Sequence, residues 1–354
     1  MSTDPSALGL NTIREVQDAY AQLRAEIQKV IVGQDEVVEQ MLMAIFCRGH
    51  AVVVGVPGLA KTLLISTIAR SLSLGFSRIQ FTPDLMPSDI TGTEVIQDDK
   101  ASGQRVLRFV KGPIFSNVIL ADEINRTPPK TQAALLEAMQ ERQVTAGGQR
   151  HELPQPFFVL ATQNPIEQEG TYPLPEAQLD RFMFQIQIRY PGMADEMEIV
   201  RRSSTKGSEV IRPVLDESRI RHIQEIVRQI PVADHVIAYA LRLVRATRVK
   251  EPMDLGLARP KLVTDYLAWG AGPRASEYLV LAARAAAAIA GSSHVTPEHV
   301  MHVARPVLRH RVMLNFNAEA DHISTDDIVN NLLEHIPVSG TTPAEKKKMD
   351  EVLR

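Results

Sequence analysis

Short apolar runs alternate with longer segments of helical periodicity through the first half of the chain. Continuous runs rich in β-branched residues are typical of strands buried on both faces of a parallel sheet, and apolar residues three and four apart are typical of amphipathic helices. Strands are predicted at 51–54, 76–81, 118–121, 157–162 and 182–188. Helices are predicted at 12–30, 35–47, 62–70, 128–142 and 176–181, with Thr127 capping the fourth. This alternation predicts an α/β fold, a mostly parallel five-stranded sheet between helices in an αβα core.

Two pairs of short polar and apolar segments interrupt that alternation. Residues 93–96 and 105–110 flank a polar loop, and residues 143–145 are followed by Gly147-Gly148 and a polar stretch. Each pair predicts a β-hairpin, and the first is predicted to be an insertion into the core.

The pattern changes after Tyr190-Pro191-Gly192, where strand signals vanish and helical periodicity dominates. Thr296-Pro297-Glu298 has the cap, proline and acidic residue typical of a helix start. The sequence therefore predicts an N-terminal helix and α/β core at 1–190, an all-helical lid domain at 191–335 and a polar tail at 336–354.

A glycine-containing loop lies between the first predicted strand and the helix that follows it. Its glycines let backbone N–H groups surround a phosphate, the helix N-terminus adds partial positive charge, and Lys61 can reach the outer phosphates. Thr62 can offer its hydroxyl to Mg²⁺. Ala60 replaces the glycine that the consensus has before the lysine, and an ordinary turn is the alternative. The predicted nucleotide-binding residues are Gly55, Val56, Pro57, Gly58, Leu59, Ala60, Lys61, Thr62 and Leu63.

Two acidic residues, Asp122 and Glu123, end the third predicted strand. Asp122 can hold Mg²⁺ through its water shell, and Glu123 can orient or deprotonate an attacking water. Alone, the pair would be interpreted as a solvated acidic turn, but the phosphate loop upstream favours catalysis. Asn164 follows the fourth strand, and its amide could hold the lytic water or sense the terminal phosphate at the same sheet edge.

The turn between the first two predicted helices contains Val32, Gly33 and Gln34. A main-chain loop of this kind could hold the edge of an adenine, and an ordinary helix-helix turn explains it equally well.

Composition and charge limit the classes of partner, cross-link and location that the chain can have. The 354 residues carry a net charge of −3, and this lack of basic excess argues against nucleic acid as the main partner. With one cysteine, Cys47, no intramolecular disulfide is possible. No basic-then-apolar signal segment is apparent, and the most apolar run, 279–290, is too short to span a membrane and contains Arg284. A soluble cytoplasmic protein without a transmembrane segment is predicted.

The chain resembles the MoxR family of AAA+ ATPases, of the helix-2 insert clade, over about residues 12–335. The resemblance rests on these segments, in this order and spacing: GVPGLAKT, ILADEINR, LLEAMQER, ATQNP, LPEAQLDRF, GAGPRAS and VLRHR. Alanine before the lysine is itself a form common in this family. The resemblance implies a P-loop AAA+ core with a lid, and a hexamer whose two hairpin insertions face a central pore.

The same resemblance assigns three further residues. It implies Asn164 as sensor 1, Arg181 as the arginine finger supplied to a neighbour's nucleotide, and Arg274 as the sensor 2 arginine. A guanidinium near the γ-phosphate stabilises transition-state charge. The alternative for Arg181 is a helix-end salt bridge. Without the resemblance, a surface position at a helix start explains Arg274 comparably well.

The implied function is ATP hydrolysis with Mg²⁺, coupled to remodelling, maturation or activation of partner proteins together with a von Willebrand factor A domain protein. The sequence identifies no client. Alternatives are a nucleotide-gated assembly scaffold with negligible turnover and a chelatase-like metal-insertion motor. A nucleic-acid motor or σ-factor activator would need a basic groove, a DNA-binding domain or the activators' specific loop, and the sequence has none of these signals.

Overall fold

The computed structural model describes residues 10–98, 105–166, 170–204, 210–253 and 258–338. Its contacts divide the chain into two compact units, one of Asp18–Gln224 and one that joins the residues up to Gln17 with those from Glu225 onwards. The predicted domain boundary after residue 190 remains a prediction, and the predicted tail lies outside the described residues from position 339.

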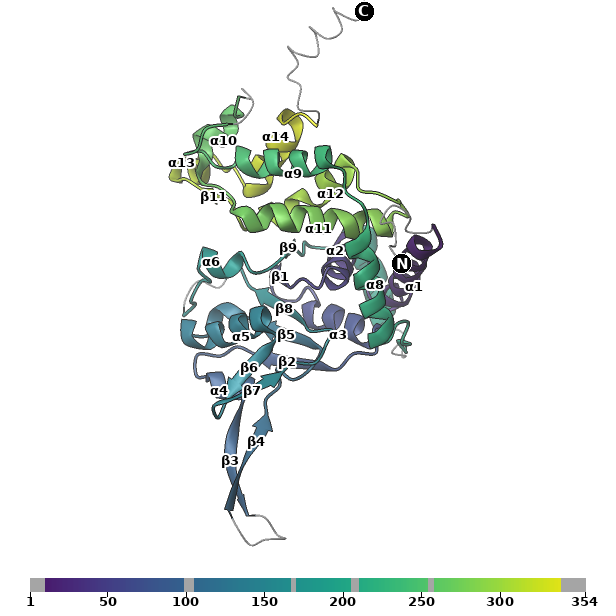
Figure 1. Ribbon diagram of the computed structural model, residues 1–354, viewed down its shortest axis with the longest axis vertical. Coiled ribbons are helices and arrows are strands. Elements are labelled where there is room, and N and C mark those ends of the chain that lie inside the picture. Colours follow the sequence, from purple (N-terminus) through teal and green to yellow (C-terminus); the bar gives the residue numbers. More distant parts are fainter. Residues whose placement is uncertain (1–9, 99–104, 167–169, 205–209, 254–257, 339–354) are drawn as a thin grey trace, which may run out of the picture. The chain divides into compact units, whose positions relative to one another are not determined.

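The first unit is built on a five-stranded sheet in the order β2-β5-β8-β1-β9, with every neighbouring pair parallel (Figure 1). This confirms the predicted sheet. Its interior strands are continuous apolar runs because both faces of the sheet are covered: residues 118–121 of β5 are fully buried. The strands are β1 (Ala51–Val54), β2 (Phe76–Gln80), β5 (Val118–Asp122), β8 (Phe158–Gln163) and β9 (Phe184–Gln187).

Helices pack on this sheet as their apolar stripes require. Leu135 and Leu136 of α5 and Ile90 of α4 form one buried cluster with Ile119 and Val159 of the sheet. Helix α3 packs against β2 and β5, and α2 packs against β9. The helices of this region are α1 (Leu10–Gln28), α2 (Asp35–Phe46), α3 (Lys61–Ser71), α4 (Pro87–Thr91), the 3₁₀ turn η1 (Ile124–Arg126), α5 (Pro129–Glu141), α6 (Glu176–Leu179), α7 (Met193–Ser204) and α8 (Glu217–Gln229).

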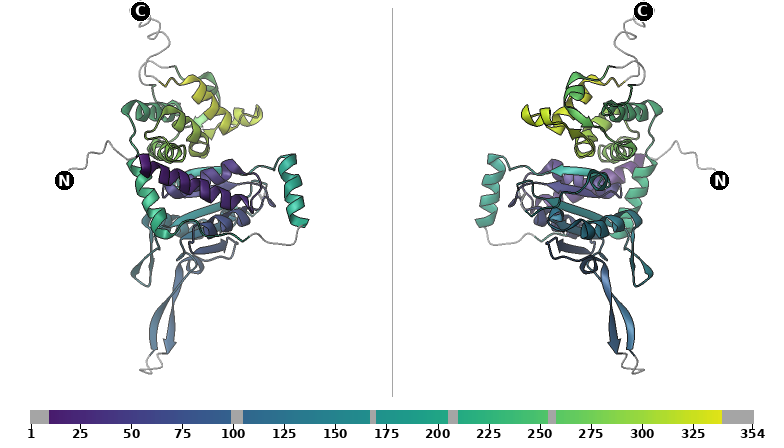
Figure 2. Two further views of the ribbon diagram at one scale, coloured as in Figure 1. Left: turned by 90° about the vertical axis from the view of Figure 1, so that its right-hand side faces the viewer. Right: turned by 90° about the vertical axis from the view of Figure 1, so that its left-hand side faces the viewer.

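Both predicted hairpins are present. Strands β3 (Gly92–Asp98) and β4 (Arg105–Lys111) pair antiparallel, as do β6 (Gln143–Ala146) and β7 (Gln149–Glu152). The β3–β4 ribbon projects from the rest of the core (Figures 1 and 2). At its root, a Cβ atom on Gly112 would lie 2.3 Å from the Ile90 carbonyl oxygen, so only glycine allows the two main chains to approach this closely.

The predicted start of α5 is wrong. The helix begins at Pro129 with Pro128 as its N-cap, and Thr127 is extended, with φ −109° and ψ 146°. A residue before proline is disfavoured in the helical region, which explains the extended backbone. The Thr127 hydroxyl instead donates a 2.8 Å hydrogen bond to the carbonyl oxygen of Thr82.

The second unit is mainly helical, as predicted. The structure adds a short antiparallel pair, β10 (Leu267–Trp269) with β11 (Met313–Leu314), whose strands are too short to produce an alternation in the sequence. The alanines of α11 are largely buried, and α11 packs along α12. The helices are α9 (Asp234–Ala246), α10 (Lys261–Tyr266), α11 (Pro273–Ile289), α12 (Pro297–Leu308), α13 (Phe316–Ala320) and α14 (Thr325–His335).

Within the described ranges, no helix combines the length and apolar character needed to cross a bilayer.

A neutral histidine is built into the core of the first unit. The Nε2 atom of His50 is 3.2 Å from the Met139 carbonyl oxygen, and its Nδ1 accepts a 3.0 Å hydrogen bond from the Val159 N–H. Because Nδ1 accepts, Nε2 carries the proton. Burial is the main cause that lowers the pKa of His50 to about 4; the hydrogen bond to the Met139 carbonyl oxygen opposes this shift, and the charge of Arg142 adds to it to a smaller degree.

His50 should therefore make stability depend on pH. Below its ordinary pKa of about 6.5 the unfolded chain binds a proton at His50 that the folded chain does not bind. The free energy of unfolding should fall by about 3 kcal/mol from this group as pH falls from about 6.5 to about 4. Urea unfolding followed by circular dichroism across this range measures the slope. The variant His50→Gln cannot titrate, so it should show a shallower slope; equal slopes would contradict the assignment.

Candidate functional site

The strand order brings the predicted site residues to one edge of the sheet. Strand β8 lies between β5 and β1, with Ala161 paired to Ala121 and Gln163 paired to Val54. Beyond the last pair, the Gly55 N–H donates a 3.3 Å hydrogen bond to the Gln163 carbonyl oxygen. Since parallel strands present their carboxyl ends together, the phosphate loop, the Asp122–Glu123 pair and Asn164 share this edge.

The predicted phosphate loop runs from β1 into α3. Gly58 has φ 86°, and Ala60, the N-cap of α3, has φ 53°. The left-handed conformation of Ala60 explains why a glycine is the consensus residue at this position. The first N–H groups of α3 have no partner inside the helix, which leaves them able to bind an anion. The Lys61 Nζ atom donates a 2.6 Å hydrogen bond to the Gly55 carbonyl oxygen across the loop.

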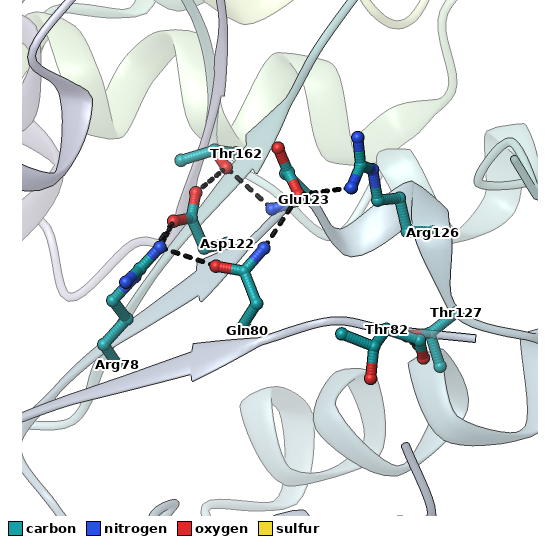
Figure 3. A network of polar contacts seen from close by, with 8 residues as sticks. All are labelled: Arg78, Gln80, Thr82, Asp122, Glu123, Arg126, Thr127 and Thr162. Atoms are coloured by element: carbon teal, nitrogen blue, oxygen red, sulfur yellow. Dashed lines mark hydrogen bonds and ion pairs between the residues drawn. The ribbon is translucent and has the colours of Figure 1, made fainter. Parts of the chain in front are cut away.

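One buried hydroxyl orients both acidic residues (Figure 3). The fully buried Thr162 donates a 2.6 Å hydrogen bond to Asp122 Oδ1, and its oxygen accepts a 2.8 Å hydrogen bond from the Glu123 N–H. Glu123 has φ 57°, a left-handed conformation that is uncommon outside glycine and that this hydrogen bond helps to hold.

Strand β2 supplies two polar side chains that the sequence analysis missed. Arg78 donates to Asp122 Oδ2 from Nε at 3.0 Å and from Nη2 at 2.7 Å, and the same Nη2 donates to Gln80 Oε1 at 2.6 Å. Gln80 in turn donates from Nε2 to Glu123 Oε2 at 2.7 Å, and Arg126 Nη1 lies 3.2 Å from the same oxygen. Positions 78 and 80 share a face of the strand, but their role emerges only once β2 is known to pair with β5.

Asn164 has an unsatisfied amide. It is 4% exposed, and its Oδ1 accepts a 3.2 Å hydrogen bond from the Ile166 N–H. Its Nδ2 is buried, and the described part of the chain gives that nitrogen no hydrogen-bond partner. Leaving a buried donor unpaired costs about 1–3 kcal/mol, so this nitrogen is suited to a ligand or a bound water.

The turn of Val32, Gly33 and Gln34 also reaches this edge. Gln34 caps α2 in the left-handed conformation, and its Nε2 donates a 3.0 Å hydrogen bond to the Arg189 carbonyl oxygen. The preceding residue, Ile188, donates its N–H to the Val54 carbonyl oxygen at the end of β1.

Arg181 and Arg274 have different settings. Arg181 is half-buried in the turn after α6, and its N–H donates to the Gln178 carbonyl oxygen. Arg274 lies in the first turn of α11, which belongs to the other compact unit. The roles of both arginines toward a nucleotide remain predictions.

Comparison with known proteins gives the family. A family model described as "ATPase family associated with various cellular activities (AAA)" matches residues 50–184, and one described as "AAA lid domain" matches residues 259–332. Chaperone MoxR1 of Mycobacterium tuberculosis is 43% identical over 331 residues, which cover 93% of this chain and 85% of that protein. Protein MoxR of Methylorubrum extorquens is 32% identical, covering 93% of this chain and 99% of that protein. The chain belongs to the MoxR family of AAA+ ATPases.

A solved structure agrees with this family. The crystal structure of a Cytophaga hutchinsonii protein assigned as an ATPase is 41% identical to the chain and superposes with a TM-score of 0.83. The comparison covers 92% of this chain and 97% of that one. The AAA+ core and its helical lid are therefore common to both proteins.

The donor atoms at the edge fit the magnesium nucleotide that AAA+ ATPases use. Thr62 offers a hydroxyl and Asp122 a carboxylate, which are the hard oxygen donors that Mg²⁺ prefers. Among the described residues, no group of three or more acidic, histidine or cysteine side chains could hold a metal alone. Mg²⁺ typically uses one or two protein ligands together with water and phosphate oxygens, so a small donor set is what a magnesium nucleotide requires.

Replacing Thr162 with the isosteric valine should separate its polar role from its packing. The change leaves Asp122 Oδ1 without one partner and the Glu123 N–H without its acceptor. Stability should fall by about 1–3 kcal/mol, measured by urea unfolding. The control is Thr67→Val, the same change at a buried threonine of α3. Equal stabilities of wild type and Thr162→Val would show that the hydroxyl does not hold the acidic pair.

Proposed function

We propose that this AAA+ chain binds Mg-ATP at the loop of residues 55–63 and hydrolyses it to ADP and phosphate. The observation that carries the proposal is the position of Glu123, which follows Asp122 directly and is held at the sheet edge where the phosphate loop begins. A water-activating carboxylate must lie at that edge to reach a terminal phosphate.

Different groups of the chain bind the phosphates, the adenine and the metal ion. The backbone N–H groups of the loop and of the first turn of α3 hold the phosphates, and the Lys61 ammonium exchanges the Gly55 carbonyl for phosphate oxygens. Val32, Gly33 and Gln34 form the adenine side of the site. Thr62 and Asp122 would hold Mg²⁺, which neutralises charge on the phosphate oxygens when bound.

Four residues act on the reaction itself. The Glu123 carboxylate accepts the proton of the attacking water or orients that water. The Asn164 amide, whose Nδ2 has no partner within the described residues, holds the water or the terminal phosphate. Arg181 neutralises transition-state charge at a neighbouring subunit's nucleotide in a hexamer, and Arg274 supplies a second positive charge from the lid.

We further propose that the cycle remodels or activates partner proteins, together with a von Willebrand factor A domain protein. Support comes from the similarity to a protein named a chaperone. It also comes from the β3–β4 ribbon, where the cross-strand pair Ile96 and Leu107 is 68% exposed at both positions. An exposed apolar pair is suited to contact with another protein.

The variant Glu123→Gln tests hydrolysis. It keeps the shape of the side chain but removes the base, so ATP affinity should persist while phosphate release falls at least about a hundredfold. Calorimetry measures binding, and Lys61→Ala, which should lose affinity, is the comparison. Near-wild-type turnover would exclude Glu123 as the activating residue. Negligible phosphate release by the wild type itself would favour a nucleotide-gated scaffold.

Mixing two inactive variants tests whether Arg181 acts across a subunit boundary. Arg181→Ala keeps its phosphate loop, and Lys61→Ala keeps its arginine. Each alone should be slowed, by about a thousandfold for the arginine. A mixed interface unites an intact loop with an intact arginine, so activity should partly recover. Continued inactivity, although mass photometry shows mixed oligomers, would mean that Arg181 has a local structural role.

Partner capture tests the remodelling proposal. Glu123→Gln held in ATP should retain a client and a von Willebrand factor A domain protein, because the hydrolysis that releases them is blocked. Lys61→Ala is the matched bait. Mass spectrometry should identify partners enriched on the first bait; the same proteins in equal amounts on both baits would argue against nucleotide-dependent remodelling.

A further inference from the structure

Asp122, the carboxylate proposed for the metal, already has a cationic partner. Both Nε and Nη2 of Arg78 donate to Asp122 Oδ2, and Thr162 donates to Oδ1. An ionised carboxylate has about four acceptor positions, so these three hydrogen bonds use most of them. The Asp122 side chain is only 10% exposed, so water screens the ion pair weakly.

The two partners of Asp122 differ in how easily they can leave. Thr162 is fully buried on β8, in the middle of the sheet. Arg78 lies on β2, the edge strand, and its side chain is 48% exposed. The long arginine side chain can swing into solvent without unpacking the core, whereas the threonine cannot move away.

We propose that Arg78 is a displaceable counter-ion that competes with a divalent cation for Asp122. Arg78 neutralises the nearly buried Asp122 carboxylate, which would be costly to bury without a partner. Arg78 gives up this place when a magnesium nucleotide binds, because the guanidinium and the metal need the same carboxylate and repel each other. Arg78 is thus a positioning residue, and the inference rests on the proposed function.

Displacement of Arg78 has a consequence for Glu123. The Arg78 Nη2 atom also donates to Gln80 Oε1, and Gln80 donates to the Glu123 carboxylate (Figure 3). When Arg78 leaves, Gln80 loses the contact that fixes its amide. Binding of the metal at Asp122 would therefore leave the Glu123 carboxylate less firmly positioned by Gln80.

A purely structural role for Arg78 predicts the opposite effect on metal binding. If Arg78 only oriented Asp122 for the metal, its removal would weaken metal binding. If it competes, its removal leaves Asp122 with uncompensated charge and strengthens metal binding.

The test measures Mn²⁺ affinity by electron paramagnetic resonance at saturating ADP. Arg78→Gln should bind Mn²⁺ more tightly, on the order of tenfold, whereas Arg78→Lys keeps the charge and should stay close to wild type. The control is Arg70→Gln, which removes an exposed arginine of α3 and should change nothing. Unchanged or weaker Mn²⁺ binding by Arg78→Gln overturns the proposal.

A further variant tests the connection through Gln80. Gln80→Ala removes one partner of Arg78 and should tighten Mn²⁺ binding less than Arg78→Gln does. It should add nothing in the Arg78→Gln background, and additive effects would overturn the connection.

Two measurements separate failure of this inference from failure of the proposed function. Wild type must bind Mn²⁺ with ADP, and Asp122→Asn must weaken that binding; if either fails, the metal site itself is wrong and the inference falls with it. If both hold and Arg78→Gln has no effect, only the inference is wrong.

A measurement on the wild type covers the case in which Arg78→Gln does not fold. The Arg78 Nε–H resonance, assigned by its loss in Arg78→Lys, should shift toward that of a solvated arginine when Mg²⁺ and ADP are added. A resonance that stays in place overturns the proposal.

Discussion

The hydrogen bonds of the Thr162 hydroxyl are the interaction on which the candidate site depends. This one group is a donor to Asp122 and an acceptor for the Glu123 N–H, so it couples two carboxylates with different proposed tasks. Its position is fixed by β8, which lies between the strand of the acidic pair and the strand of the phosphate loop. Packing of that central strand therefore determines where both carboxylates lie.

Three loops at the same edge use left-handed residues other than glycine. Gln34, Ala60 and Glu123 have φ values of 59°, 53° and 57°. Each such conformation costs about 1–2 kcal/mol, so surrounding contacts must hold it. Gln34 is tied to the Arg189 carbonyl oxygen and Glu123 to Thr162. At these three positions the left-handed backbone lets the chain turn sharply from a strand or into a helix.

Each carboxylate of the acidic pair has a cationic partner within the protein. Asp122 faces Arg78, and Glu123 faces Arg126 and Gln80. Such pairing offsets part of the cost of holding two adjacent, partly buried carboxylates, and it also occupies the atoms that the proposed reaction needs. In the proposed function, a cation and a nucleotide would have to exchange partners with the protein, which would couple their binding to rearrangement of the acidic pair.

The sequence by itself predicted the strands of the main sheet and the candidate site residues. Continuous apolar runs predicted the five strands, glycines and Lys61 marked the phosphate loop, and Asp122 and Glu123 stood out at a strand end. These features are local, because burial on both faces and the demands of a tight turn act on neighbouring residues.

Only the tertiary structure decided the strand order, and with it the partners of the acidic residues. Arg78, Gln80 and Thr162 lie about forty positions from the carboxylates they contact, and nothing in a local pattern distinguishes them from ordinary strand residues. Even the start of α5 was settled this way, since Thr127 bonds to Thr82 instead of capping the helix. Local periodicity records which face of a strand is buried, whereas side-chain partners follow from pairings between distant segments that one-dimensional patterns do not encode.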